Sequence, residues 1–341
     1  MCVLLPLGFL FTFIHMEFRT NFSIQPQQNK VTYDHPVITM GSCFSSLLGH
    51  RMGLGKMNVL GNPFGVIFNP VTVCELITNS LLKISLPGEG FLDSNGYHYH
   101  YLTHSTLFGR TFKELNQRLQ VIQSNVSDTI SKASHVFFTW GSSYVYKKQP
   151  EGLIVANCHK QPSRLFEKRL LNLSEMKSAF SKCYAAMIRV QPNIQLVLTV
   201  SPVRHIKDGI PENQLSKSLL RILCHELAET HAQVSYFPSY EWMVDDLRDY
   251  RFYKPDLIHP SEVAEEYIWQ EFQKVYFDQK TQSLWERIKR IQTSLAHKPF
   301  HPESMSHQTF LRNLLNEMEE LSPRVDFCSE IEGVKRQLES I

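Results

Sequence analysis

Two short stretches of the chain carry side chains that could perform acyl-transfer chemistry. The first, MGSCFSSLLG, places Ser42 and Cys43 where an apolar, β-branched run gives way to a helical pattern. The second, YKPDLIHPS, places Asp256 and His259 three residues apart in a proline-bounded loop. Such an aspartate can accept the imidazole Nδ1–H and leave Nε2 free to take a proton from a serine hydroxyl. The residue types therefore predict a Ser42–His259–Asp256 nucleophilic site.

The backbone around Ser42 adds a second element of that chemistry. A turn from a strand into a helix leaves the first N–H groups of the helix free, beginning with that of Cys43. These groups would face a negative oxygen that forms on a substrate carbonyl. The Cys43 thiol, at a helix start next to Ser42, is an alternative nucleophile. Plainer interpretations remain, since Ser42 could be an N-cap and Asp256 a turn residue.

Histidines and an arginine elsewhere offer further candidate sites. In YHYHYLTH, His98 and His100 lie on one strand face, a spacing that could bind a metal but more commonly serves packing or substrate contact. His104 follows them. Arg204 and His205 come after the apolar run LVLTVSP and could bind a carboxylate or sugar oxygen, or form a structural salt bridge. We expect no metal ion and no organic cofactor.

The elements that must position these residues alternate between strand and helix. Short apolar runs predict strands at 37–41, 135–141, 194–202 and 232–240. Helical patterns between and after them predict helices at 44–56, 72–84, 111–131, 173–190, 213–230 and 261–277. Continuously apolar strands need cover on both faces, so the pattern predicts a three-layer α/β/α flavodoxin-like sandwich with a parallel sheet.

The α/β domain is expected to cover residues 16–278, and residues 1–15 to be an apolar extension, an upstream start or an export signal. Two further segments differ from the alternating pattern. Segment 91–108 has an Asn-Gly turn typical of a β-hairpin. Residues 279–341 are amphipathic and predict a helical tail, whose apolar stripe leaves dimerisation open.

Composition limits the function classes. The 341 residues are 43% hydrophobic and 20% charged, as in a globular protein, and the formal net charge of +2 gives no footprint for nucleic acid or an anionic membrane. The apolar start is too short to span a bilayer. Seven cysteines without close pairs favour a reducing compartment, so we expect a cytoplasmic protein, or an exported one if residues 1–15 are a true signal.

Several blocks, in order, resemble the GSCFA-domain proteins, which are similar to the SGNH or GDSL hydrolase superfamily. They are GSCF, NPFGVIFNP, HSTLFG, TWGSSYVY, NCHK, TVSPVRHIKDG, ENQLSKS, YFPSYEWMVDDLRDYRFY and DLIHPS. The resemblance covers the chain from about residue 16 to about residue 275. Ser45 stands where the family motif has alanine.

The resemblance implies a serine nucleophile, here Ser42, and the Asp256–His259 pair. It also implies an oxyanion hole made by the N–H groups near the nucleophile, a glycine N–H and an asparagine side chain. Gly65 is the candidate glycine, and His104 falls in a block suited to a substrate pocket.

The asparagine is missing from the block that should carry it. The strand HVFFTWG ends at Gly141 and continues as Ser142–Ser143, so Gly141, Ser142, Ser143 or the more distant Asn157 could supply the donor. We therefore expect a serine ester hydrolase that acts on a small acyl ester, such as an O-acetyl group on a glycan. The alternatives are an acyltransferase with the same triad and a non-catalytic binding module on the same fold.

Overall fold

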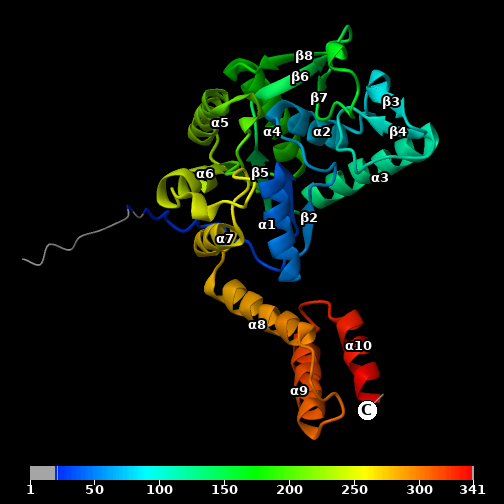
Figure 1. Cartoon of the computed structure of the whole chain (residues 1–341), viewed down its shortest axis with the longest axis vertical. Helices are drawn as coiled ribbons and strands as arrows, with labels where there is room; N and C mark the ends of the chain where they lie inside the picture. The colour runs from blue at the N-terminus through cyan, green and yellow to red at the C-terminus, as the bar shows by residue number, and fades with distance from the viewer. Residues whose placement is uncertain (1–19, 21, 340–341) are drawn as a thin grey trace, which may run out of the picture.

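The computed structural model describes residue 20 and residues 22–339, so the expected extension at residues 1–15 lies outside the described part. A parallel five-stranded sheet with helices on both faces forms its centre (Figure 1), which confirms the predicted α/β/α sandwich. The sheet strands are β1 (Val37–Gly41), β2 (Val59–Gly61), β5 (His135–Trp140), β9 (Gln195–Val200) and β10 (Val234–Tyr236).

The order of these strands across the sheet is β10-β9-β5-β1-β2. Counted along the chain and read from the β2 edge, this is the order 2-1-3-4-5 of flavodoxin-like sheets. The chain therefore reverses its direction of progress between β1 and β5, whose register pairs Gly41 with Thr139. In such sheets, ligands bind beyond the carboxyl ends of the strands at this reversal.

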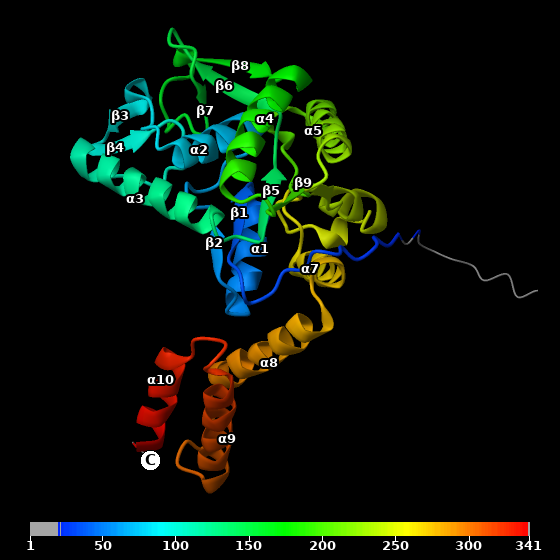
Figure 2. The same ribbon diagram turned by 180° about the vertical axis from the view of Figure 1, so that it is seen from behind.

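Helices cover the two faces unequally (Figures 1 and 2). The helices of the α/β domain are α1 (Cys43–Leu54), α2 (Pro70–Leu82), α3 (Phe112–Ile130), α4 (Leu173–Val190), α5 (Ile210–Thr230), α6 (Ser239–Glu241) and α7 (Glu262–Tyr276). On one face α1 and α7 pack against Phe137 and Val197, and on the other α2 to α5 pack against Phe138 and Leu198. The alternation of buried side chains along each strand thus supplies two cores.

Short helical turns join these elements. They are η1 (Gly88–Gly90), η2 (Ser163–Leu165), η3 (Ile206–Asp208), the π-helical η4 (Trp242–Asp246) and η5 (Tyr250–Phe252).

Two small antiparallel units are inserted at the carboxyl side of the sheet. The expected hairpin is formed by β3 (Phe91–Ser94) and β4 (Tyr97–His100), joined by Asn95 and Gly96 with φ of 53° and 77°. Positive φ at both turn positions is what an Asn-Gly hairpin turn requires. A further unit that the sequence did not predict consists of β6 (Tyr144–Lys148), β7 (Ile154–Val155) and β8 (Phe166–Leu170).

The tail consists of α8 (Gln279–Ala296), α9 (Met305–Leu321) and α10 (Cys328–Glu339), which hang from one end of the domain (Figure 1). Their apolar residues pack against one another, with Ile288, Met318 and Phe327 fully buried. Much of the apolar surface of the tail thus packs within the chain, while Phe300 and Met305 are exposed, and dimerisation stays a prediction.

The tail is attached where α1 ends. The Lys56 ammonium donates to the carbonyl of Asp326 at 2.7 Å and pairs with Glu330 at 2.6 Å. The indole of Trp285 packs so closely on Gly55 that a Cβ there would lie 2.1 Å from the ring. Tyr33 also donates its hydroxyl to the carbonyl of Gly55 at 2.8 Å.

Candidate active site

The turn that holds Ser42 requires a glycine before it. Gly41 has φ +135°, and a Cβ at this position would lie 2.0 Å from the carbonyl oxygen of Thr139. The same oxygen accepts the N–H of Ser42 at 2.9 Å. Asn62, in the loop after β2, accepts the N–H of Gly41 at 2.8 Å. These contacts fix Ser42 at the N-cap of α1, beside the reversal between β1 and β5.

The Ser42 side chain does not cap its helix. Ser42 has the extended backbone of an N-cap, with φ −74° and ψ −177°, but its hydroxyl makes no capping hydrogen bond. In other helices of the chain the N-cap side chain accepts a first-turn N–H; these N-caps are Asn69, Thr111, Asn172, Ser261, Asp278 and Ser304. The Ser42 residue is 1% exposed, and its Oγ has no hydrogen-bond partner among the described residues. The hydroxyl is therefore not used to support the helix.

Asp256 and His259 form a short, oriented pair. Oδ2 of Asp256 accepts Nδ1–H of His259 at 2.7 Å, while Oδ1 accepts the backbone N–H groups of Ile258 and His259 at 2.9 and 3.0 Å. The bond from the His259 backbone, followed by that from its ring, lowers the pKa of Asp256 to about 2. The imidazole is thus held with Nε2 away from the carboxylate.

The loop that carries this pair is attached to the carboxyl end of β9. Arg204 donates its backbone N–H to Ile258 at 3.1 Å and its guanidinium to the carbonyl of Leu257 at 3.0 Å. That guanidinium also lies over the ring of Tyr253. Asp256 and His259 therefore lie at the same end of the sheet as Ser42.

Ser42 and His259 are at one end of the sheet but are not hydrogen-bonded to each other. β9 and β1 are separated by β5 in the sheet, and the unpartnered Ser42 Oγ is buried while the His259 side chain is 39% exposed. The loop after β2 closes over the nucleophile turn, since Ile67 donates to the carbonyl of Gly41 at 2.9 Å. The Ser–His contact of an acyl-transfer site is therefore not formed in this conformation.

The glycine expected to serve as an oxyanion donor has its N–H occupied. Gly65 donates to the carbonyl of Asn62 at 2.7 Å, and its Cα packs against His104, whose Cβ would lie 2.2 Å from a Cβ on Gly65. His104 in turn donates its N–H to Phe64 at 3.0 Å. The structure thus brings Gly65 and His104 together at the loop beside Ser42, without a free N–H on the glycine.

The candidates after β5 are occupied as well. Gly141 and Ser142 both donate their backbone N–H to the carbonyl of Phe68, at 2.8 and 3.1 Å. The Ser142 hydroxyl accepts the N–H of Tyr144 at 3.0 Å and lies 3.3 Å from the Ser216 hydroxyl.

Ser143 and Asn157 are bound elsewhere. The Ser143 hydroxyl contacts that of Ser216 at 3.0 Å. Asn157 accepts the N–H of His159 at 2.7 Å and donates its own N–H to Tyr101 at 3.2 Å, within the inserted units. These contacts use the carbonyl oxygen and the backbone N–H of Asn157 and leave its side-chain NH2 as a candidate donor, beside the N–H of Cys43, which has no intrahelical acceptor.

The Cys43 thiol is a poorer nucleophile than its position suggests. Burial raises its pKa, an effect only partly opposed by a hydrogen bond from its own backbone. A thiol with a raised pKa stays protonated near neutral pH, so the helix start does not produce a thiolate here.

Lys217 is a site residue that the sequence analysis did not single out. Its ammonium is buried and donates to the carbonyls of Gly141 and Ser201, both at 2.8 Å, at the ends of β5 and β9. Burial lowers its pKa to about 7. A sequence signal existed, because Lys217 shares the apolar face of its helix with Leu220 and Cys224 at spacings of three and seven.

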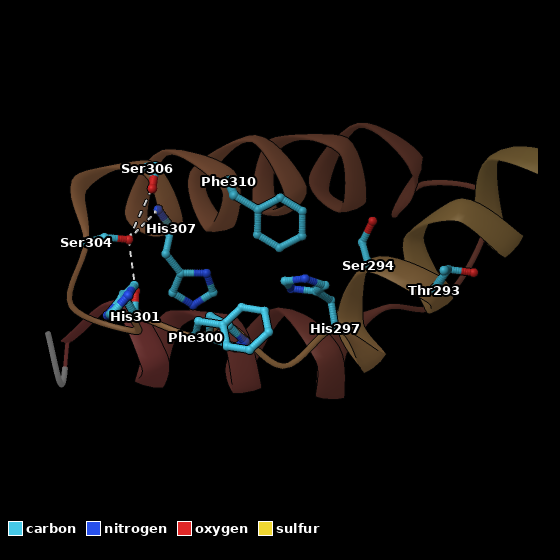
Figure 3. A pocket seen from close by; sticks show the side chains of 10 residues that line it. Thr293, Ser294, His297, Phe300, His301, Ser304, Ser306, His307 and Phe310 are labelled. Atoms are coloured by element: carbon cyan, nitrogen blue, oxygen red, sulfur yellow. Dashed lines mark hydrogen bonds between the residues drawn. The ribbon is translucent and has the colours of Figure 1, made fainter.

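A hollow of the described chain lies away from this site. It has a volume of about 530 Å³ and lies on the tail, between the end of α8 and the start of α9. Figure 3 shows the rings of His297, His307 and Phe310 around it, beside Phe300. None of the expected site residues lines it.

Comparison with known proteins identifies two regions. The GSCFA family matches residues 36–272, which include Ser42, Asp256 and His259, and the family described as GSCFA domain protein, C-terminal domain, matches residues 288–340. No curated protein matches the chain. In the part of the chain that the structure describes, every helix is too short or too polar to cross a membrane.

Proposed function

Since the chain belongs to the GSCFA family, we propose that it is a serine ester hydrolase with Ser42 as nucleophile, His259 as general base and Asp256 as the residue that orients His259. The supporting observation is the pairing of an oriented Asp256–His259 couple with a serine at a helix start whose hydroxyl caps nothing. These are the residues that the resemblance to SGNH hydrolases implies.

The reaction begins when His259 Nε2 takes the proton from Ser42 Oγ. The oxygen forms a bond to the ester carbonyl carbon, and the carbonyl π pair moves onto its oxygen. When the tetrahedral intermediate collapses, the bond to the alcohol breaks and His259 returns the proton to the leaving oxygen. Water then repeats the sequence and releases the acid, leaving Ser42 as it began. The substrate class is a small acyl ester, such as an O-acetyl group on a glycan.

For this reaction the loop over Ser42 must open. The loop is held by Ile67, which donates to the carbonyl of Gly41, and by the Asn62 side chain, which donates to the Ser46 hydroxyl at 2.7 Å and to the carbonyl of Ser42 at 3.4 Å. Gly141 and Ser142 also donate to the carbonyl of Phe68 in the same loop. His259, with 39% of its side chain exposed, has room to turn toward the opened site.

The burial of Ser42 favours one competing function. If the loop stays closed, the fold is a binding module that has no acyl-enzyme chemistry. A fluorophosphonate probe, which reacts only with an activated serine, distinguishes the two. We expect labelling of the folded protein that is lost in Ser42→Ala and retained in Cys43→Ala. Absence of labelling of the folded wild-type protein would favour the binding module.

A second measurement separates hydrolysis from transfer. If the labelled serine turns over p-nitrophenyl acetate, adding glycerol as an acceptor alcohol leaves acetate as the main product of a hydrolase. Acetylated glycerol as the main product would instead identify an acyltransferase.

A further inference from the structure

His205 has a buried ring nitrogen without a partner. Its Nε2 makes no hydrogen bond to any described residue, although the backbone N–H of His205 is held by Asn213 at 2.8 Å. A buried polar atom left without a partner destabilises the folded state. Such an atom needs an explanation, and a ligand that supplies the missing partner is one.

The position of this nitrogen is defined by two contacts. The ring of His205 packs edge-on against Phe68, with centroids 4.9 Å apart. A Cβ on Gly141 would lie 3.1 Å from Nε2, which is a tight contact, so the glycine leaves space beside the nitrogen. Nε2 therefore faces the residue that follows β5.

Gly141 borders the reversal point of the sheet. It lies two residues beyond Thr139, the register partner of Gly41, and Cys43 lies two residues beyond Gly41 at the start of α1. Parallel strands are about 4.8 Å apart. Nε2 of His205 thus faces the chain that leaves β5, the strand next to the one that leads into Ser42 and Cys43.

His205 is neutral at this position. Burial is the main cause that lowers its pKa to about 3, and the charges of Lys217 and His259 act in the same direction. A neutral imidazole with its hydrogen on Nε2 is a hydrogen-bond donor that does not compete with His259 for the serine proton. The Lys217 ammonium donates to the carbonyl of Gly141 and so holds the backbone that Nε2 of His205 faces.

We propose that His205 is a catalytic residue that donates its Nε2–H to the ester carbonyl oxygen as that oxygen becomes negative, and so completes the oxyanion hole with the N–H of Cys43. This role rests on the proposed ester hydrolysis at Ser42. The His205 side chain takes the place of the asparagine that the chain lacks after β5, where the backbone N–H groups of Gly141 and Ser142 already donate to the carbonyl of Phe68. No bond to His205 forms or breaks, and its proton stays on Nε2.

The test compares His205→Phe, which keeps a flat ring against Phe68, with His205→Gln, which keeps a donor. The matched control is His135→Phe, which replaces another buried histidine, at the amino end of β5, also with a pKa lowered by burial to about 4. With p-nitrophenyl acetate, we expect His205→Phe to lower kcat on the order of 10²–10³-fold with little change in KM, as for loss of one oxyanion donor. His205→Gln should recover part of that loss, and the control should leave kcat unchanged.

The outcomes are distinguishable. If Ser42→Ala abolishes turnover while folded His205→Phe stays within about twofold of wild type, the role of His205 is overturned and the proposed function stands. If no turnover depends on Ser42, the proposed function and the role of His205 are both overturned.

A spectroscopic measurement on the wild-type protein tests the role of His205 even when a variant does not fold. Phenylboronic acid forms a tetrahedral adduct with an activated serine, with an oxygen in the oxyanion position. In the wild-type protein, we expect the nitrogen resonance of His205 Nε2 to shift when the adduct forms, whereas an unshifted resonance would overturn the role.

Discussion

Oδ2 of Asp256 lies 2.7 Å from Nδ1 of His259, and the other oxygen of the same carboxylate accepts the backbone N–H of His259 at 3.0 Å. One side chain thus fixes both the ring and the backbone of its partner. This double contact determines the tautomer of His259, because the Nδ1 position must carry the hydrogen.

Asp256→Asn tests the importance of that tautomer. An amide can donate to Nδ1 and favour the wrong tautomer, so we expect kcat to fall on the order of 10⁴-fold, as when the aspartate of a serine-protease triad is changed in the same way. The matched control is Asp93→Asn, since the exposed Asp93 lies 3.7 Å from His98 in a looser pair. Turnover of p-nitrophenyl acetate that is equal in both variants would contradict a catalytic role for Asp256.

The pKa of Asp256 predicts the pH profile. Its depression from 3.8 to about 2 means that the carboxylate stays charged until the pH falls below this range, where the pair is lost. The ionisation of Asp256 should therefore lower kcat/KM only as the pH falls toward 2. A proton uptake by Asp256 near its usual pKa of 3.8, seen in the acid limb of kcat/KM, would contradict this lowered pKa.

Ser42→Ala should not destabilise the protein. Its hydroxyl is buried without a partner and makes no cap, so its removal is expected to leave the free energy of unfolding unchanged or raise it. Thr111→Ala removes a real cap, the hydrogen bond from Glu114 at 3.1 Å, and should cost about 1 kcal/mol. Urea unfolding of both variants gives the comparison, and an equal loss in both would mean that Ser42 has a structural role.

Gly41→Ala should prevent correct folding. The added Cβ would lie 2.0 Å from the backbone of Thr139 at a φ of +135°, and neither strand can move without breaking the sheet. The control, Gly53→Ala, lies near the end of α1, where the nearest atom is 3.9 Å away, and should be neutral or gain up to about 1 kcal/mol. Soluble yield and circular dichroism measure both, and a folded, stable Gly41→Ala variant would contradict the steric account.

Lys217→Met should alter the dependence of stability on pH. Between about 7, the pKa of Lys217 in the folded protein, and 10.5, its usual value, the unfolded chain holds a proton that the folded chain lacks. Stability should therefore rise with pH in this window through Lys217, by up to about 1.4 kcal/mol per pH unit. Urea unfolding across the window should show the difference between wild type and variant growing with pH, and a constant difference would refute a lowered pKa.

The sheet and its helices could be predicted because each depends on local pattern. The strand at 37–41 and the helix at 173–190 have the bounds that their apolar periodicity indicated, and the hairpin followed from Asn95–Gly96. The short strand β2 was missed because its three residues, two half-buried and one exposed, carry no clear period. The unit of β6, β7 and β8 was missed because its strands are only partly buried and alternate weakly.

The site shows the same division between local and distant contacts. The Asp256–His259 bond joins residues three apart, so the loop sequence was enough to predict it. The backbone N–H groups of Gly141 and Ser142 donate to the carbonyl of Phe68, in a loop more than seventy positions away, and no pattern in the sequence indicates this contact. The unbonded state of Ser42 is likewise a property of packing, which composition and spacing cannot reveal.

The attachment of the tail gives α1 two different ends. Ser42 is its N-cap. Just beyond its last residue, Gly55 packs against Trp285 and Lys56 pairs with Glu330. Twelve helical residues span about 18 Å and behave as one stiff rod. The attachment point of the tail and the turn that holds Ser42 are therefore the two ends of one rigid element.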